Sequence, residues 1–103
     1  MSKEKAMGKY VLLGNWTDQG ARTVTDTVKR SRAARETFAA LGANARKWFF
    51  TLGAYDVVLT VDAPDDETWT RAQLALASEG NLRTTTLRGF GENDVEVIVS
   101  TLG

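Results

Sequence analysis

The succession of apolar patterns along the chain predicts an α+β domain, in which two helices cover a four-stranded antiparallel sheet. Strand-like apolar runs lie at about residues 9–16, 46–52, 55–61 and 82–90. Helical spacing of apolar residues separates the first run from the second and the third from the fourth. Gly53 lies between the second and third runs, so these two form a hairpin. The resulting order, β-α-β-β-α-β, is that of the ferredoxin-like split motif.

The first half of this motif is a strand followed by a helix. The strand at residues 9–16 is apolar except for an interruption at Gly14, and a polar break follows at residues 17–20. The helix is expected at about residues 26–41, with Thr25 or Asp26 as its N-terminal cap and Gly42 as its left-handed C-terminal residue. Its predicted inner face consists of Val28, Ser31, Ala34, Phe38 and Leu41.

The second half is a hairpin followed by a helix and a strand. Gly53 and Ala54 are expected to form a two-residue turn. The acidic residues within 63–67 suit the positive N-terminal end of a helix, which Gly80 and Asn81 then end. β-branched threonines favour a strand at residues 82–90. The predicted inner stripe of this helix is Trp69, Ala72, Gln73, Leu76 and Ala77.

Composition excludes several kinds of site. The 103 residues contain 13 basic and 13 acidic side chains, so the net charge of zero argues against nucleic acid or an anionic membrane as a partner. The chain has no cysteine and no histidine, which excludes disulfides, a thiolate nucleophile and zinc-thiolate sites. The run Asp65-Asp66-Glu67 is interpreted as helix capping rather than metal ligation. We therefore predict neither a metal nor a cofactor.

The N-terminal segment is polar. Residues 1–8 lack the apolar region of a signal peptide, and no run in the chain approaches the ~20 apolar residues that span a bilayer. We expect a disordered segment at residues 1–8, a single domain at residues 9–103 and a cytoplasmic location.

Apolar side chains point to both faces of the predicted sheet. Trp48, Phe50 and Leu52 alternate with Phe49 in the second strand, and the first and third strands alternate in the same way. Two helices cover one face only. Leaving the large groups of the other face in water costs several kcal/mol at roughly 25 cal/mol per Å². We therefore predict a homodimer, or a higher oligomer, joined sheet to sheet. The alternative is a half-apolar open sheet, which antiparallel sheets tolerate.

Four blocks of sequence resemble the GYD-domain family. The family's Gly-x-Tyr-Asp segment is matched by Gly53, Tyr55 and Asp56, and the similarity extends from about Lys9 to the C-terminus. The blocks are residues 13–20, 51–58, 63–66 and 80–88, in the family's order.

The resemblance implies a dimeric α+β barrel of a largely uncharacterised family. It also implies a C-terminal helix at residues 92–102, where periodicity alone fits a strand and a helix equally well. Ala54 stands where such proteins often carry arginine, so an anion-binding role of that arginine is not transferred.

The candidate ligand-binding residues fall in two groups. Backbone N–H groups around Thr17, where the first strand enters the loop, could hold a small anion, and a large aromatic there could equally close the end of a barrel. Polar side chains on otherwise apolar strands could reach into a dimer cavity. The candidates are Asn15, Trp16, Thr17, Gly20, Tyr55, Asp56 and Arg83, with Gly53 as the structural turn.

Tyr55 and Asp56 admit a structural and a chemical interpretation. Asp56 could accept backbone N–H bonds at the turn or pair with Arg83 or Arg88, and it could alternatively be a general base. Tyr55 is interpreted as a packed ring in preference to a proton donor. The basic residues of the first helix are interpreted as a solvated face, with a surface for acidic partners as the alternative. These are Lys29, Arg30, Arg32 and Arg35.

Three classes of function fit these features. The preferred one is a non-catalytic small-ligand-binding or regulatory homodimer. The second, from the superfamily resemblance, is a cofactor-independent enzyme, monooxygenase or isomerase-like, that would use Asn15, Trp16, Tyr55 and Arg83. The third is a structural assembly subunit. The missing histidine and cysteine lower the weight of the enzymatic class.

Overall fold

The computed structural model describes residues 7–103. Of the segment predicted to be disordered, residues 1–6 lie outside the described residues, and Gly8 begins the first strand.

The sheet has four antiparallel strands in the order β2-β3-β1-β4. Strand β1 (Gly8–Trp16) and strand β3 (Val57–Ala63) pair at its centre, with β2 (Asn44–Phe50) outside β3 and β4 (Leu82–Gly89) outside β1. The predicted ferredoxin-like topology is therefore confirmed.

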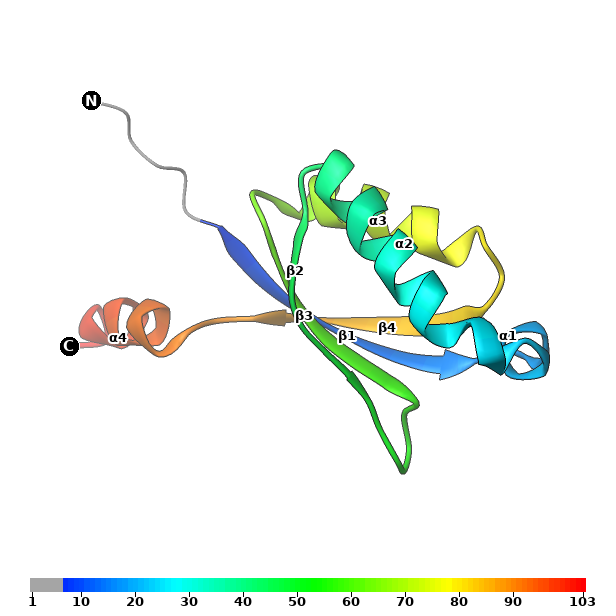
Figure 1. Ribbon diagram of the computed structural model, residues 1–103. Coiled ribbons are helices and arrows are strands. Elements are labelled where there is room, and N and C mark those ends of the chain that lie inside the picture. Colours follow the sequence, from blue (N-terminus) through cyan, green and yellow to red (C-terminus); the bar gives the residue numbers. More distant parts are fainter. Residues whose placement is uncertain (1–6) are drawn as a thin grey trace.

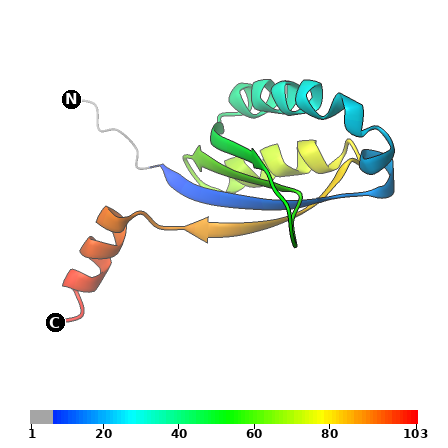
Figure 2. The same cartoon turned by 60° about the horizontal axis from the view of Figure 1, so that its bottom comes forward.

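Two helices cover one face of the sheet and leave the other bare (Figures 1 and 2). These helices are α2 (Thr27–Ala40) and α3 (Asp66–Ala77). The core between the two layers is aromatic at its centre, where Phe38 packs edge-on against Trp69 with ring centroids 5.4 Å apart. The largest fully buried side chains are Phe38, Leu12, Leu59, Val57 and Val61.

The segment before α2 differs from the prediction. The expected polar break contains a short helix, α1 (Asp18–Arg22), followed by the 3-10 turn η1 (Val24–Asp26). Thr17 caps α1 because its hydroxyl accepts from the Gly20 N–H, whereas Asp26 makes no side-chain cap on α2. Val28, which the helical spacing assigns to the inner face, is 52% exposed because α2 turns only Ala34 and Phe38 fully inward.

The hairpin loop is longer than predicted. Strand β2 ends at Phe50 and β3 begins at Val57, so residues 51–56 form a loop rather than a two-residue turn. Its ends are held by the Thr51 N–H, which donates to the Asp56 carbonyl at 2.9 Å. Leu52, expected to continue the second strand on the face of Trp48 and Phe50, lies in this loop and is fully exposed.

Gly53 adopts a φ of +119°, a conformation that L side chains rarely enter. We expect Gly53→Val to lower the free energy of unfolding by more than ~1 kcal/mol, because of backbone strain alone. A Cβ at this position meets no neighbouring atom within 4 Å. Urea denaturation checks the value, with Ala54→Val in the same exposed loop as the control. Equal stability of the two variants would contradict a conformational role for Gly53.

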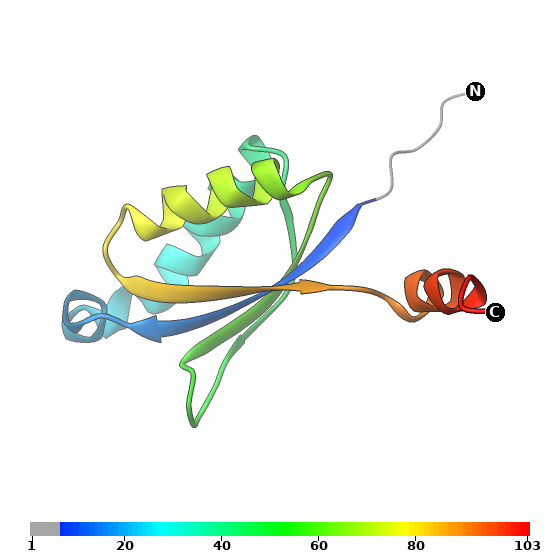
Figure 3. The same cartoon turned by 180° about the vertical axis from the view of Figure 1, so that it is seen from behind.

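The C-terminal segment is a helix, as the family resemblance implied. Helix α4 (Glu92–Ser100) begins after Gly91, whose N–H donates to the Asp94 carboxylate at 3.0 Å. The helix lies beyond the end of the sheet, away from α2 and α3 (Figures 1 and 3). The Cα radius of gyration, 15.4 Å, consequently exceeds the roughly 13 Å typical of a compact domain of about 100 residues.

Candidate functional site

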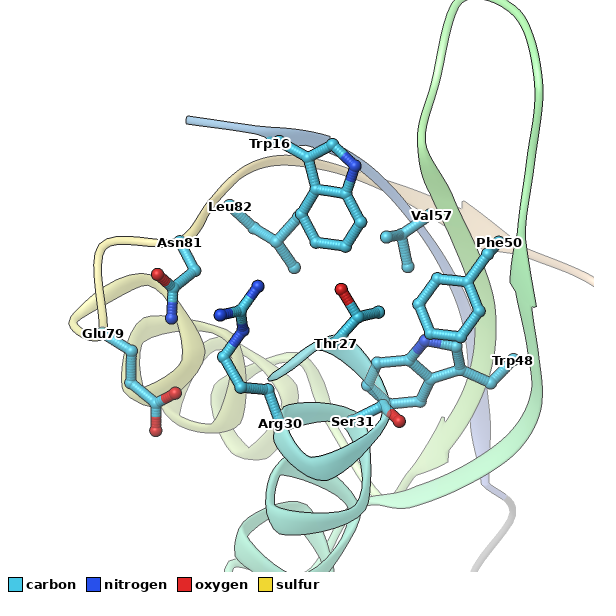
Figure 4. Close-up of a pocket in the computed structure, with 10 residues that line it drawn as sticks. All are labelled: Trp16, Thr27, Arg30, Ser31, Trp48, Phe50, Val57, Glu79, Asn81 and Leu82. Atoms are coloured by element: carbon cyan, nitrogen blue, oxygen red, sulfur yellow. The ribbon is translucent and has the colours of Figure 1, made fainter. Parts of the chain in front are cut away.

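A small pocket lies where β1 and β2 end beside the start of α2 (Figure 4). Its volume is about 20 Å³, which is room for roughly one water molecule. In this structure it is therefore too small for an organic ligand. Its lining consists of Trp16, Thr27, Arg30, Ser31, Trp48, Phe50, Val57, Glu79, Asn81 and Leu82.

Trp16 forms one wall of this pocket. Its ring stacks on Phe50 with centroids 6.5 Å apart, and the Arg30 guanidinium lies 6.0 Å from its centroid. Arg30 is fixed there because it donates hydrogen bonds to the carbonyl and hydroxyl oxygens of Thr23, at 2.8 and 2.7 Å. Trp16 thus closes the end of the domain, and Arg30 departs from the predicted solvated face.

Trp48 is a pocket residue that the sequence pattern did not single out as a candidate. Its Nε1–H is buried and has no hydrogen-bond partner among the described residues. The ring stacks on Phe38 at 6.4 Å, while the Arg35 guanidinium lies 5.3 Å from its centroid. Its position on an alternating strand indicated only which face of the strand it shares with Phe50, and no sequence signal distinguishes an unpaired indole N–H from a paired one.

Thr17 and Gly20 join the β1–α1 turn to the α3–β4 turn. The Thr17 N–H donates to the Asn81 carbonyl at 3.1 Å, and its hydroxyl donates to the Gly80 carbonyl at 2.6 Å. The Gly20 N–H in turn donates to the Thr17 hydroxyl at 3.1 Å. The N–H groups of Thr17 and Gly20, which the sequence analysis considered as donors to a small anion, both donate to partners within the chain.

Asp56 binds the end of β1. One carboxylate oxygen accepts from the Trp16 N–H at 3.0 Å, and the Asp56 N–H donates to the Gly14 carbonyl at 2.8 Å. Asn15 adds a third link from its side-chain amide to the Ala54 carbonyl, at 2.9 Å. Tyr55, in the same loop, is 37% exposed. Asp56 therefore acts as a backbone acceptor at the turn, one of the two structural roles considered for it.

The uncovered face of the sheet carries a continuous group of apolar side chains. Five side chains form it, and we call them the open-face cluster. Two of its members, Phe49 and Leu87, are 56% and 50% exposed, and the other three are half-buried. Leu13 pairs with Val58, which in turn pairs with Phe49, so the cluster is continuous across three strands. The cluster consists of Val11, Leu13, Phe49, Val58 and Leu87.

Asn15 and Arg83 lie beside this cluster. Asn15 on β1 pairs with Arg83 on β4. Asn15 lies two residues after Leu13, a member of the open-face cluster, and side chains two residues apart on a strand share a face. Both Asn15 and Arg83 therefore belong to the open face. Arg83 is exposed and forms no ion pair with any residue in the range 7–103. The structure thus brings these two predicted residues together, apart from Trp16 and Thr17.

A second polar cluster, which no sequence pattern indicated, lies at the opposite end of β1. The hydroxyl of the buried Tyr10 donates to Asp66 Oδ1 at 2.5 Å, and Arg88 Nε lies 3.8 Å from the same oxygen. The Arg88 guanidinium is held between two rings, 5.2 Å from the centroid of Tyr10 and 4.7 Å from that of Phe90. The alternation of the first strand predicted only that Tyr10 lies on the same face of that strand as Leu12.

The GYD domain family matches residues 10–99 of the chain. This chain belongs to the GYD family. A GYD relative, the glutamine synthetase and cystathionine beta-lyase binding protein of Thermus thermophilus, is 32% identical over 90 residues. The alignment spans 86% of this chain and 95% of that protein.

Among solved structures, the GYD domain resembles the crystal structure of MtbAldR, with a TM-score of 0.65 at 16% identity. The match covers 82% of this chain and 52% of the MtbAldR chain, so the GYD domain spans about half of that longer chain. This likeness concerns the fold alone, which is ferredoxin-like with the strand order β2-β3-β1-β4.

A metal-binding group and a membrane-spanning helix are both absent from residues 7–103 of the GYD domain. Across residues 7–103, no three His, Cys, Asp or Glu side chains lie where they could hold a metal ion together. Within the same range, no helix has the length and apolar character required to cross a membrane.

The cluster of Tyr10, Asp66 and Arg88 is expected to make the stability of the GYD domain fall at alkaline pH. Burial, followed by the hydrogen bond to Asp66, raises the pKa of Tyr10 from 10.0 to about 12. Between these values the unfolded chain loses the Tyr10 proton while the folded chain keeps it, so stability falls as pH rises above 10. We expect Tyr10→Phe to flatten this decline, measured as the unfolding free energy from about pH 9 to pH 12. Parallel pH curves for the two proteins would contradict the assignment.

Proposed function

We propose that this GYD domain is a non-catalytic binding and regulatory protein that works as a homodimer with its two sheets facing each other. The open-face cluster carries this proposal, because its side chains are apolar and continuous yet uncovered by their own chain. Fully burying one such side chain contributes about 1.5–3 kcal/mol. Burial of the exposed parts of these side chains between two facing copies would therefore favour association.

The relative's name supports an enzyme as the partner of this dimer. That protein binds glutamine synthetase and cystathionine beta-lyase by its name, and the alignment covers nearly its whole length. We propose that the GYD dimer likewise binds a metabolic enzyme. The role of Asp56 as an acceptor for the Trp16 N–H favours this proposal over a general-base reaction, because the carboxylate is already engaged.

A small ligand inside the dimer is a second candidate, favoured by Asn15 and Arg83. Their register on the open face would place both groups in the space between the two sheets. A guanidinium without an ion-pair partner among residues 7–103 suits a small carboxylate, which it can bind through two hydrogen bonds. Native mass spectrometry of the purified dimer, compared with an Arg83→Gln variant, would detect such a ligand by its mass.

We expect Phe49→Asp to raise the dimer dissociation constant at least about tenfold, because it places a charge in the apolar interface. Sedimentation at micromolar concentration measures this change. Val28→Asp is the matched control, since Val28 is similarly exposed on α2 but lies outside the open face. A monomeric parent protein would contradict the dimer.

Partner binding is tested separately. Calorimetric titration of the dimer into purified glutamine synthetase and cystathionine β-lyase from the same organism should show saturable binding to one of them. The Phe49→Asp variant should bind more weakly if the dimer is the binding form. A dimer that binds neither enzyme would contradict the proposed partner but leave the homodimer standing.

A further inference from the structure

Helix α4 carries an apolar stripe that its own chain does not cover. Val95, Ile98 and Val99 on the helix, and Leu102 just beyond its last residue, follow helical spacing, and each of them is at least 42% exposed. A nine-residue helix is marginal in water without packing partners. Since α4 lies away from the two layers of the domain (Figures 2 and 3), another surface must support it.

The bare side of the sheet has a hollow near the end from which α4 departs. The hollow has a volume of about 450 Å³, and Phe90, the residue just before Gly91 and α4, forms part of its rim. Its lining includes Val11 and Thr60, two paired residues of the open face, which we call its floor. The charged residues around it are Lys9, Arg46, Lys47 and Asp62.

The charge of this hollow is opposite to that of α4. Lys9 and Arg46 lie 3.7 and 3.6 Å from the two carboxylate oxygens of Asp62, and Lys47 is a third basic group. Three basic side chains against one acidic side chain give the hollow a net charge of +2. Helix α4 contains Glu92, Asp94 and Glu96 and no basic residue, which gives it −3.

We propose that α4 crosses to a second copy of the chain and lies in the hollow of that copy, with its apolar stripe against the floor. This inference rests on the proposed homodimer and adds an exchanged arm to it. The hollow and the start of α4 share one end of the sheet, so a two-fold axis running roughly along the strands brings each arm beside the opposite hollow. Pairing of the two α4 helices with each other is disfavoured, because both are acidic.

Cysteine crosslinking tests the exchange directly, since the natural chain has no cysteine. The double variant Lys47→Cys/Val99→Cys, with Lys47 in the lining of the hollow, should give covalent dimers with a short bis-maleimide, and neither single variant should do so. A covalent monomer from the double variant would overturn the exchange, because α4 would then lie on its own chain. Covalent dimers from Val99→Cys alone would also overturn it, because the arms would then pair with each other.

Sedimentation of the same variants separates this inference from the proposed function. A stable dimer without the predicted crosslink would leave the homodimer intact and reject the arm, whereas a monomer would reject both.

A charge scan of α4 gives an independent measurement. Val99→Glu should raise the dimer dissociation constant at least about tenfold, because the stripe then carries a buried charge. Val97→Glu is the matched control, since Val97 lies on the opposite side of the helix and is 67% exposed. Equal dissociation constants for the two variants would overturn the proposed docking of the stripe.

Discussion

Phe38→Ala is expected to lower the free energy of unfolding by about 3–5 kcal/mol, the range for removing a buried phenyl group from a core. The Phe38 side chain is fully buried, and its ring contacts the rings of Trp48 and Trp69. The substitution therefore leaves a cavity where α2, α3 and β2 meet. A loss of this size is a large part of the roughly 5–15 kcal/mol by which domains are stable.

Val28→Ala on the same helix provides the comparison for Phe38. Because Val28 is half exposed, this change should stay within about 0.5 kcal/mol of the parent protein. Chemical denaturation of both variants measures the difference. Similar losses at the two positions would place Val28 in the core, as the sequence pattern predicted, and contradict the observed face of α2.

Gly20→Ala is expected to destabilise the domain by about 2–3 kcal/mol, near the upper end of the usual range for overpacking. A Cβ at Gly20 would lie 2.2 Å from the Asn81 carbonyl oxygen. That atom belongs to the backbone, so the β1–α1 turn and the α3–β4 turn must separate to make room. The bond from the Thr17 N–H to the same oxygen would then lengthen or break.

Gly14→Ala is the matched variant for this second test. Gly14 is also buried, but a Cβ there would meet side-chain carbons of Leu82, Leu12 and Val57 at 3.4, 3.5 and 3.6 Å, which is ordinary contact. The Gly14 variant should therefore lose clearly less stability in thermal or urea unfolding. Equal losses would indicate a general cost of added bulk, without a specific clash at Asn81.

The fold was largely predictable because each element has its own local signal. The alternation of apolar residues predicted the strands, and the acidic run at Asp65–Glu67 predicted the start of α3. Gly42 and Gly80 predicted two helix ends, and both adopt positive φ there. The errors occurred where tertiary contacts decide the structure. Helix α1 depends on Thr17, whose hydroxyl both caps it and reaches Gly80 in a distant part of the chain.

The candidate residues could be selected from the sequence, but their arrangement could not. Asn15 and Arg83 were chosen as polar residues on apolar strands, and the register of β1 and β4 makes them neighbours. Asp56 was chosen for its place at the turn, although its bond to the Trp16 N–H requires that β1 ends beside the hairpin loop. The cluster of Tyr10, Asp66 and Arg88 joins three separate elements, so no local pattern reveals it.

The strand order also constrains how the chain can fold during synthesis. Strand β1 has β3 and β4 as neighbours, and Lys9 pairs with Gly89 near the far end of the described chain. Among the strands of residues 7–103, the β2–β3 hairpin alone joins strands that follow one another directly. Pairings between distant segments form slowly, and chains emerge from the ribosome N-terminus first. We therefore expect β1 to remain half-paired until Gly89 has emerged, which leaves one edge of this central strand open to pairing with other chains until then.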